Sequence, residues 1–73
     1  MPTSVSPVPM RPEYAELDLV RLRSILYTEA GTIPAGSQGT IVFSHDHGAA
    51  YEVEFVAPFP LVATLRAADL AAA

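Results

Sequence analysis

The chain lacks cysteine and lysine, and each absence excludes a class of structure or function. Without cysteine, no disulfide can stabilise the fold, and no thiolate can ligate zinc or act as a nucleophile. The net charge is −4, and the only cations are Arg11, Arg21, Arg23 and Arg66. Because nucleic-acid binding depends on neutralising phosphates, this balance argues against nucleic acid as a partner.

Long apolar runs are also missing. No apolar run approaches the length of a membrane span, which is about 20 residues. The N-terminus also lacks the basic region followed by an apolar region that marks a secretory signal. We therefore expect a cytoplasmic protein with no membrane partner. The 73 residues make one domain at most. A core of this size supplies only about 3–5 kcal/mol, so a second copy of the chain is a candidate partner.

Proline is concentrated at the start of the chain, at Pro2, Pro7, Pro9 and Pro12. Proline removes backbone donors and favours extended geometry, so residues 1–13 are expected to form a disordered tail. The domain is then expected over residues 14–70, with a second short tail over residues 71–73.

Alternation of apolar and polar residues predicts strands over 18–23, 39–44, 50–56 and 61–66. Tyr51, Val53 and Phe55 are expected to face the core together, and Ile41 and Phe43 are expected to share a face. A helix over 14–26 fits the first segment almost as well, although β-rich neighbours favour the strand.

The segments between these strands complete the predicted fold. Residues 24–38 are expected to form a long connection, and residues 67–70 a short helical turn. The pattern therefore predicts an all-β fold, a small SH3-like β-barrel of four to five strands in which closure limits exposed edges.

Between Glu16 and Leu70 the chain contains the segments LDLVRL, IPAG, GTIV and, most specifically, YEVEFV. With these segments it resembles a family of small bacterial proteins known only as a domain of unknown function. The resemblance implies the barrel and favours the strand over the helix at residues 18–23. It implies no catalytic or binding residue. Pro58-Phe59-Pro60 departs from the Gly- or Asp-containing turn usual in the family, so the last hairpin is expected to have a different shape here.

His45, Asp46 and His47 form the cluster closest to a chemical site. Two imidazoles and a carboxylate could ligate zinc, nickel or copper, but a third or fourth ligand is needed from elsewhere. We favour a polar turn with solvated histidines. No serine stands in a nucleophile motif, so we expect no enzyme and no cofactor.

Three aromatic residues are the candidates for contact with a partner: Phe59 between two prolines, and Tyr14 and Tyr27 near the long connection. The alternative for Phe59 is that its ring folds back and caps one end of the barrel. The leading functional prediction is a non-catalytic interaction module that binds an unknown protein partner or itself. A KOW-like RNA- or ribosome-associated barrel is one alternative, and a weak metal-binding hairpin at His45 and His47 is another.

Overall fold

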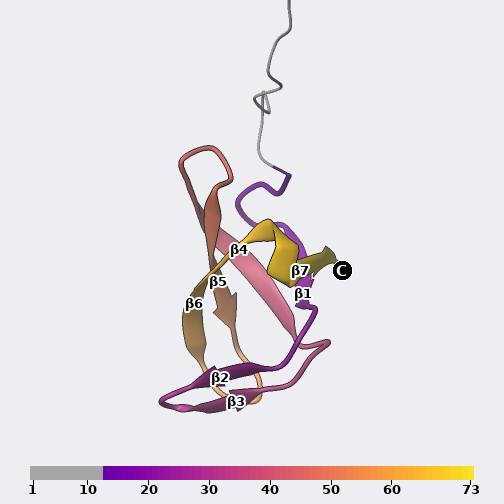
Figure 1. The fold of residues 1–73 in the computed structure, drawn as a ribbon, viewed down its shortest axis with the longest axis vertical. Helices are drawn as coiled ribbons and strands as arrows, with labels where there is room; N and C mark the ends of the chain where they lie inside the picture. The colour runs from indigo at the N-terminus through magenta and orange to yellow at the C-terminus, as the bar shows by residue number, and fades with distance from the viewer. Residues whose placement is uncertain (1–12) are drawn as a thin grey trace, which may run out of the picture.

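The computed structural model describes residues 13–73, which form seven strands and one turn of 3-10 helix (Figure 1). The strands are β1 (Leu19–Leu22), β2 (Leu26–Thr28), β3 (Gly31–Ile33), β4 (Gln38–His45), β5 (Ala50–Phe55), β6 (Leu61–Leu65) and β7 (Leu70–Ala72). Five of them make an antiparallel sheet in the order β6-β5-β4-β1-β7, and β2 and β3 make a separate hairpin. The all-β prediction is confirmed. The expected tail lies outside the described residues, except for residue 13.

The first strand forms where alternation predicts it, and the helical alternative is wrong. Val20 and Leu22 are buried while Arg21 is exposed, the pattern of a strand with one face in the core. A tight turn precedes β1, because the Asp18 carboxylate accepts a hydrogen bond from the amide of Ala15 at 2.9 Å. This turn leaves no room for a helix that begins at residue 14.

The hairpin of β4 and β5 supplies the centre of the core. Tyr51, Val53 and Phe55 are fully buried, which confirms that they share the inner face. The prediction that Ile41 and Phe43 share a face is wrong, because the register shifts between them. This β-bulge adds one residue to β4, so Ile41 stays in the core and Phe43 points outward.

The expected long connection over 24–38 contains the hairpin of β2 and β3. Thr28 closes this hairpin: its hydroxyl donates to the carbonyl of Gly31 at 2.7 Å and accepts from the amides of Ala30 and Gly31 at 3.1 Å. Ile33 on β3 is fully buried, so the hairpin folds back over the core instead of standing free as a loop. Three-residue strands are too short for their alternation to be recognised in the sequence.

The C-terminal prediction is partly wrong. The helical turn is present at Ala67–Asp69, but the residues expected as a tail continue into β7, which pairs with β1. Arg23 holds this strand in place, since its Nε donates to the carbonyl of Leu70 at 2.8 Å. Leu70 is fully buried. Alanine has little strand propensity of its own, and the pairing with β1 overrides it.

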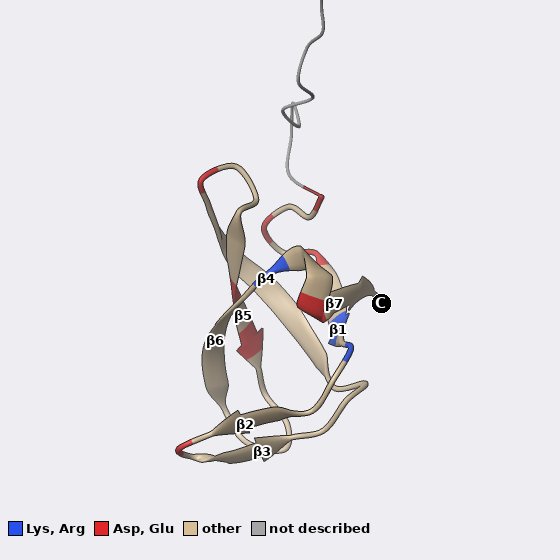
Figure 2. Cartoon of the chain, viewed as in Figure 1, with Lys and Arg blue, Asp and Glu red and all other residues tan. Residues whose placement is uncertain are grey.

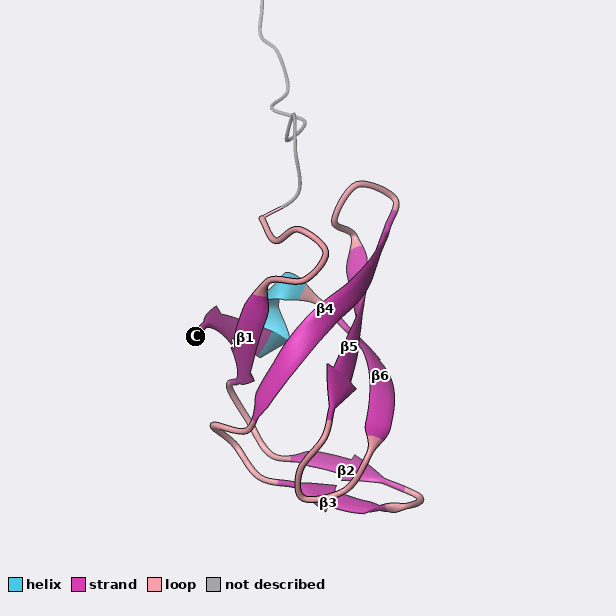
Figure 3. Ribbon diagram, turned by 180° about the vertical axis from the view of Figure 1, so that it is seen from behind, coloured by secondary structure: helices cyan, strands magenta, loops and turns pink. Residues whose placement is uncertain are grey.

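The core lies between the inner face of the five-stranded sheet and the segments folded against it (Figure 3). Its buried side chains come from the segment before β1 and from every strand except β2, and they are Tyr14, Val20, Leu22, Ile33, Ile41, Tyr51, Val53, Phe55, Leu65 and Leu70. The opposite side of the sheet is covered by no other element among residues 13–73.

Candidate interaction surface

The side of the five-stranded sheet turned away from the core is here called the outer face. Its residues are the outward positions of β1, β4, β5 and β6, namely Leu19, Arg21, Gln38, Thr40, Phe43, His45, Ala50, Glu52, Glu54, Val62 and Thr64. Strand register aligns them in rows across the sheet. One row contains Leu19, Thr40, Glu54 and Val62, and the next contains Phe43, Glu52 and Thr64.

Large apolar side chains interrupt the polar character of the outer face. Leu19 is 50% exposed, Phe43 is 49% exposed and Val62 is 53% exposed, and they lie on three different strands. Single exposed hydrophobic residues are normal on a protein surface, but several on one sheet face are typical of a contact surface. Leu19 and Val62 stand at strand positions where alternation usually places polar residues, and their apolar character is the signal that sequence analysis missed. Phe43 reaches this face only through the β-bulge, since it was expected to share a face with Ile41.

The edge of the outer face is strand β6. It pairs with β5 and with no other strand among residues 13–73, and it forms one side of the sheet in Figures 1 and 3. No proline or charged residue lies within Leu61–Leu65. Edge strands usually carry such residues as protection against pairing with other chains, so β6 is available for a further strand.

A small polar network lies beside the apolar residues. His45 Nε2 and Glu52 Oε2 are 2.6 Å apart, and the hydroxyl of Thr64 donates to the same carboxylate oxygen at 2.8 Å. The bond with His45 is the largest cause that lowers the pKa of Glu52, and the bond with Thr64 is the next. The ring of Phe43 packs edge-on against His45, with 4.9 Å between ring centroids.

The structure separates the residues of the predicted metal-binding hairpin. His45 points onto the outer face and contacts Glu52, whereas His47 lies in the turn between β4 and β5 with a φ of 57°. Within residues 13–73, no group of three or more histidine, cysteine or acidic side chains could hold a metal ion. The geometry therefore gives the metal-binding alternative no ligand set in this part of the chain.

The three aromatic contact candidates lie in different surroundings. Tyr14 is only 8% exposed and packs edge-on against Tyr51 in the core, where burial and the charge of Glu13 raise its pKa. Phe59 is half-buried and packs on the core, so it caps the fold instead of projecting from it. Tyr27 on β2 is 75% exposed and alone of the three presents its ring to solvent.

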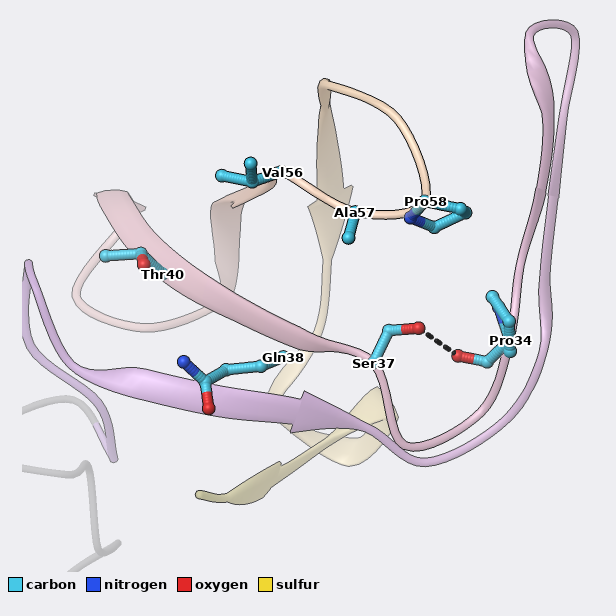
Figure 4. Close-up of a pocket in the computed structure, with 7 residues that line it drawn as sticks. All are labelled: Pro34, Ser37, Gln38, Thr40, Val56, Ala57 and Pro58. Atoms are coloured by element: carbon cyan, nitrogen blue, oxygen red, sulfur yellow. Dashed lines mark hydrogen bonds between the residues drawn. The ribbon is translucent and has the colours of Figure 1, made fainter.

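A shallow pocket of about 450 Å³ opens at one end of the outer face (Figure 4). The start of β4 and the turn before it form one wall, and the connection from β5 to β6 forms the other. Its lining residues are Pro34, Ser37, Gln38, Thr40, Val56, Ala57 and Pro58. None of these side chains carries a charge, so the pocket adds apolar surface and a few hydrogen-bonding groups to the outer face.

Charge is distributed unevenly over the domain (Figure 2). The carboxylates of Glu52 and Glu54 lie on the β5 part of the outer face. Arg21, an outward position of β1, brings one positive charge to the outer face and donates to the carbonyl of Gly36 at 2.8 Å. Arg23 donates to the carbonyl of Leu70. The outer face is therefore apolar and negative on β5 and β6, with one arginine on β1.

The fold and this surface define a small all-β domain with an exposed apolar face. Residues 16–58 match a domain of unknown function, DUF4926. This match covers more than half of the chain, and the chain belongs to that family. No curated protein and no solved structure matches it. The bacterial origin and cytoplasmic location expected from the sequence stay predictions. No helix within residues 13–73 has the length and apolar character needed to cross a membrane.

Proposed function

We propose that this domain is a non-catalytic interaction module that binds a protein partner, or a second copy of itself, through the outer face. One observation carries the proposal: exposed Leu19, Phe43 and Val62 share one sheet face that ends in an unprotected edge strand. Burial of such side chains is the main favourable term in protein association.

The arrangement of strands also supports the SH3-like barrel as the scaffold of this module. A five-stranded sheet in the order β6-β5-β4-β1-β7, a hairpin folded over the core after β1, and a 3-10 turn before the last strand are features of that architecture. Fold alone does not determine function, so the proposal depends on the surface and not on the architecture.

The RNA-binding alternative has less support. Residues 13–73 carry eight acidic side chains and three arginines, and two of those arginines bond backbone carbonyls within the fold. A phosphate backbone would meet mainly negative charge on the outer face.

Affinity purification of the tagged chain from its native host, with protein and RNA both analysed, tests the proposal. Phe43→Ser removes an apolar side chain from the outer face, and Tyr27→Ser is the matched control because it removes an exposed aromatic ring on β2. We expect a stoichiometric protein, or a dimer of the chain, that is lost with Phe43→Ser and kept with Tyr27→Ser. Loss of the partner with Tyr27→Ser and its retention with Phe43→Ser would place the binding surface on the β2–β3 hairpin. Recovery of RNA without protein would overturn the proposal.

A further inference from the structure

We infer that the β6 edge binds an extended, positively charged segment of the partner protein, which adds to the sheet as a further strand. Lysine or arginine side chains of that segment lie over Val62 and reach Glu54. This inference rests on the proposed function, and it specifies where the partner lies and which chemistry it carries.

The backbone of β6 provides the first part of the site. The strand has five residues with the sequence LVATL, and its far edge has no strand partner among residues 13–73. The other edge of the sheet, β7, is only three residues long. An added strand gains main-chain hydrogen bonds at β6 whatever its sequence, and the neighbouring side chains then decide which sequence fits.

Glu54 provides the charge that selects the partner. It is exposed on the outer face directly across from Val62, and its carboxylate has no ion-pair partner among residues 13–73. Glu52 differs, because His45 and Thr64 already bond its carboxylate.

The spacing of strands makes the contact geometrically feasible. Neighbouring strands lie about 4.8 Å apart, so a residue added opposite Val62 would lie about 10 Å from the backbone of Glu54. An extended lysine or arginine side chain covers most of that distance, and the side chain of Glu54 covers the rest. The apolar stem of the partner's side chain would then pack on Val62 and bury its exposed side chain.

The inner side of β6 determines which residues fit at the inward-facing positions of the partner strand. Leu61 and Ala63 are half-buried and pack on the core from the edge of the sheet. Residues of the added strand that face inward would extend this apolar layer. The segment that fits is therefore one in which basic and apolar residues alternate.

A second copy of the chain fits this edge less well. Pairing of two β6 strands would place Val62 and Thr64 of the second copy on the outer face, and neither can neutralise Glu54. It would also bring a second Glu52 and Glu54 to the same face, between chains that each carry a net charge of −4. Like charges on one face oppose such pairing.

Two synthetic peptides and two charge variants test the inference by NMR of the labelled protein. One peptide alternates lysine with valine, and the other alternates glutamate with valine. Glu54→Gln removes the proposed contact, and Glu29→Gln is the matched control, because Glu29 is exposed in the β2–β3 turn and its loss changes the net charge equally. We expect the lysine peptide alone to shift the amide signals of residues 61–65. Its affinity should fall about two- to fivefold in Glu54→Gln, as for other exposed ion pairs, and stay unchanged in Glu29→Gln.

Three results would overturn the inference. The first is no shift of the β6 amides at millimolar lysine peptide, and the second is equal weakening by both variants. The third is a shift of the same amides with protein concentration when no peptide is present, which would assign the edge to a second copy. All three leave the proposed function intact, since the Phe43→Ser purification tests that separately.

Discussion

Phe59 packs against Gly31, and this contact joins the connection between β5 and β6 to the hairpin of β2 and β3. A β-carbon added at Gly31 would lie 3.0 Å from Cε2 of the Phe59 ring, closer than a side chain tolerates without a shift. Gly31 also has a φ of 141°, a conformation that residues with side chains rarely adopt. The half-buried ring therefore caps the fold, which is the alternative that the sequence left open beside a role for Phe59 in contact with a partner.

Gly31→Ala should lower the free energy of unfolding by about 3 kcal/mol, because backbone strain and overpacking against Phe59 add together. Gly36→Ala is the control, since Gly36 has a φ of 86° but no atom within 4 Å of an added β-carbon. Strain alone should cost about 1 kcal/mol there. Urea unfolding measures both variants. In a Phe59→Ala background the effect of Gly31→Ala should shrink, and an undiminished effect would contradict the contact.

Ser44→Ala should stabilise the protein. The residue lies opposite Tyr51 on the inner side of β4, and its buried hydroxyl has no hydrogen-bond partner among residues 13–73. A buried unpaired hydroxyl costs about 1 kcal/mol, so its removal should raise the free energy of unfolding by that amount.

Ser37→Ala provides the contrast, because its hydroxyl donates to the carbonyl of Pro34 at 2.7 Å. The free energy of unfolding of that variant should be lower by about 0.5–1 kcal/mol in the same urea measurement. A loss of stability in Ser44→Ala would show that its hydroxyl is bonded after all.

The sequence-based predictions were accurate where a pattern ran over several consecutive residues, and they failed where it was interrupted. Tyr51, Val53 and Phe55 alternate without interruption, and both their strand and their buried face were predicted correctly. The face of Phe43 was predicted incorrectly, because a β-bulge depends on pairing with a partner strand, and no residue of β4 itself indicates it. One inserted residue reverses every side chain that follows it.

The candidate site was harder to predict than the fold. Leu19 and Val62 are distant in the sequence, and only strand register places them in one row with Glu54. The aromatic candidates were chosen for their chemistry, but burial of Tyr14 is decided by its contact with Tyr51, which lies 37 residues away. Such long-range packing cannot be read from local composition.

Tyr51→Phe should destabilise the fold through one hydrogen bond. The backbone amide of Tyr14 donates to the hydroxyl of Tyr51 at 3.1 Å in a buried position. Without the hydroxyl this amide has no partner, which should cost about 1–3 kcal/mol in urea unfolding. Tyr14→Phe is the control, because the Tyr14 hydroxyl makes no hydrogen bond within residues 13–73, and it should change stability less. Equal losses would show that the rings, not the hydrogen bond, hold this segment.

Acid should weaken the network of His45, Glu52 and Thr64. The two hydrogen bonds hold the pKa of Glu52 below its ordinary value of 4.5, so folding favours the ionised carboxylate. The resulting stabilisation is complete above the ordinary pKa and is lost as pH falls through the lowered one. Thr64→Val removes one donor and should move the pKa of Glu52 back toward 4.5, as followed by NMR titration of the carboxyl carbon.

Thr40→Val, opposite Glu54 in the neighbouring row, should leave the Glu52 titration unchanged. An equal shift in both variants would mean that the Thr64 hydroxyl has no specific part in ionising Glu52.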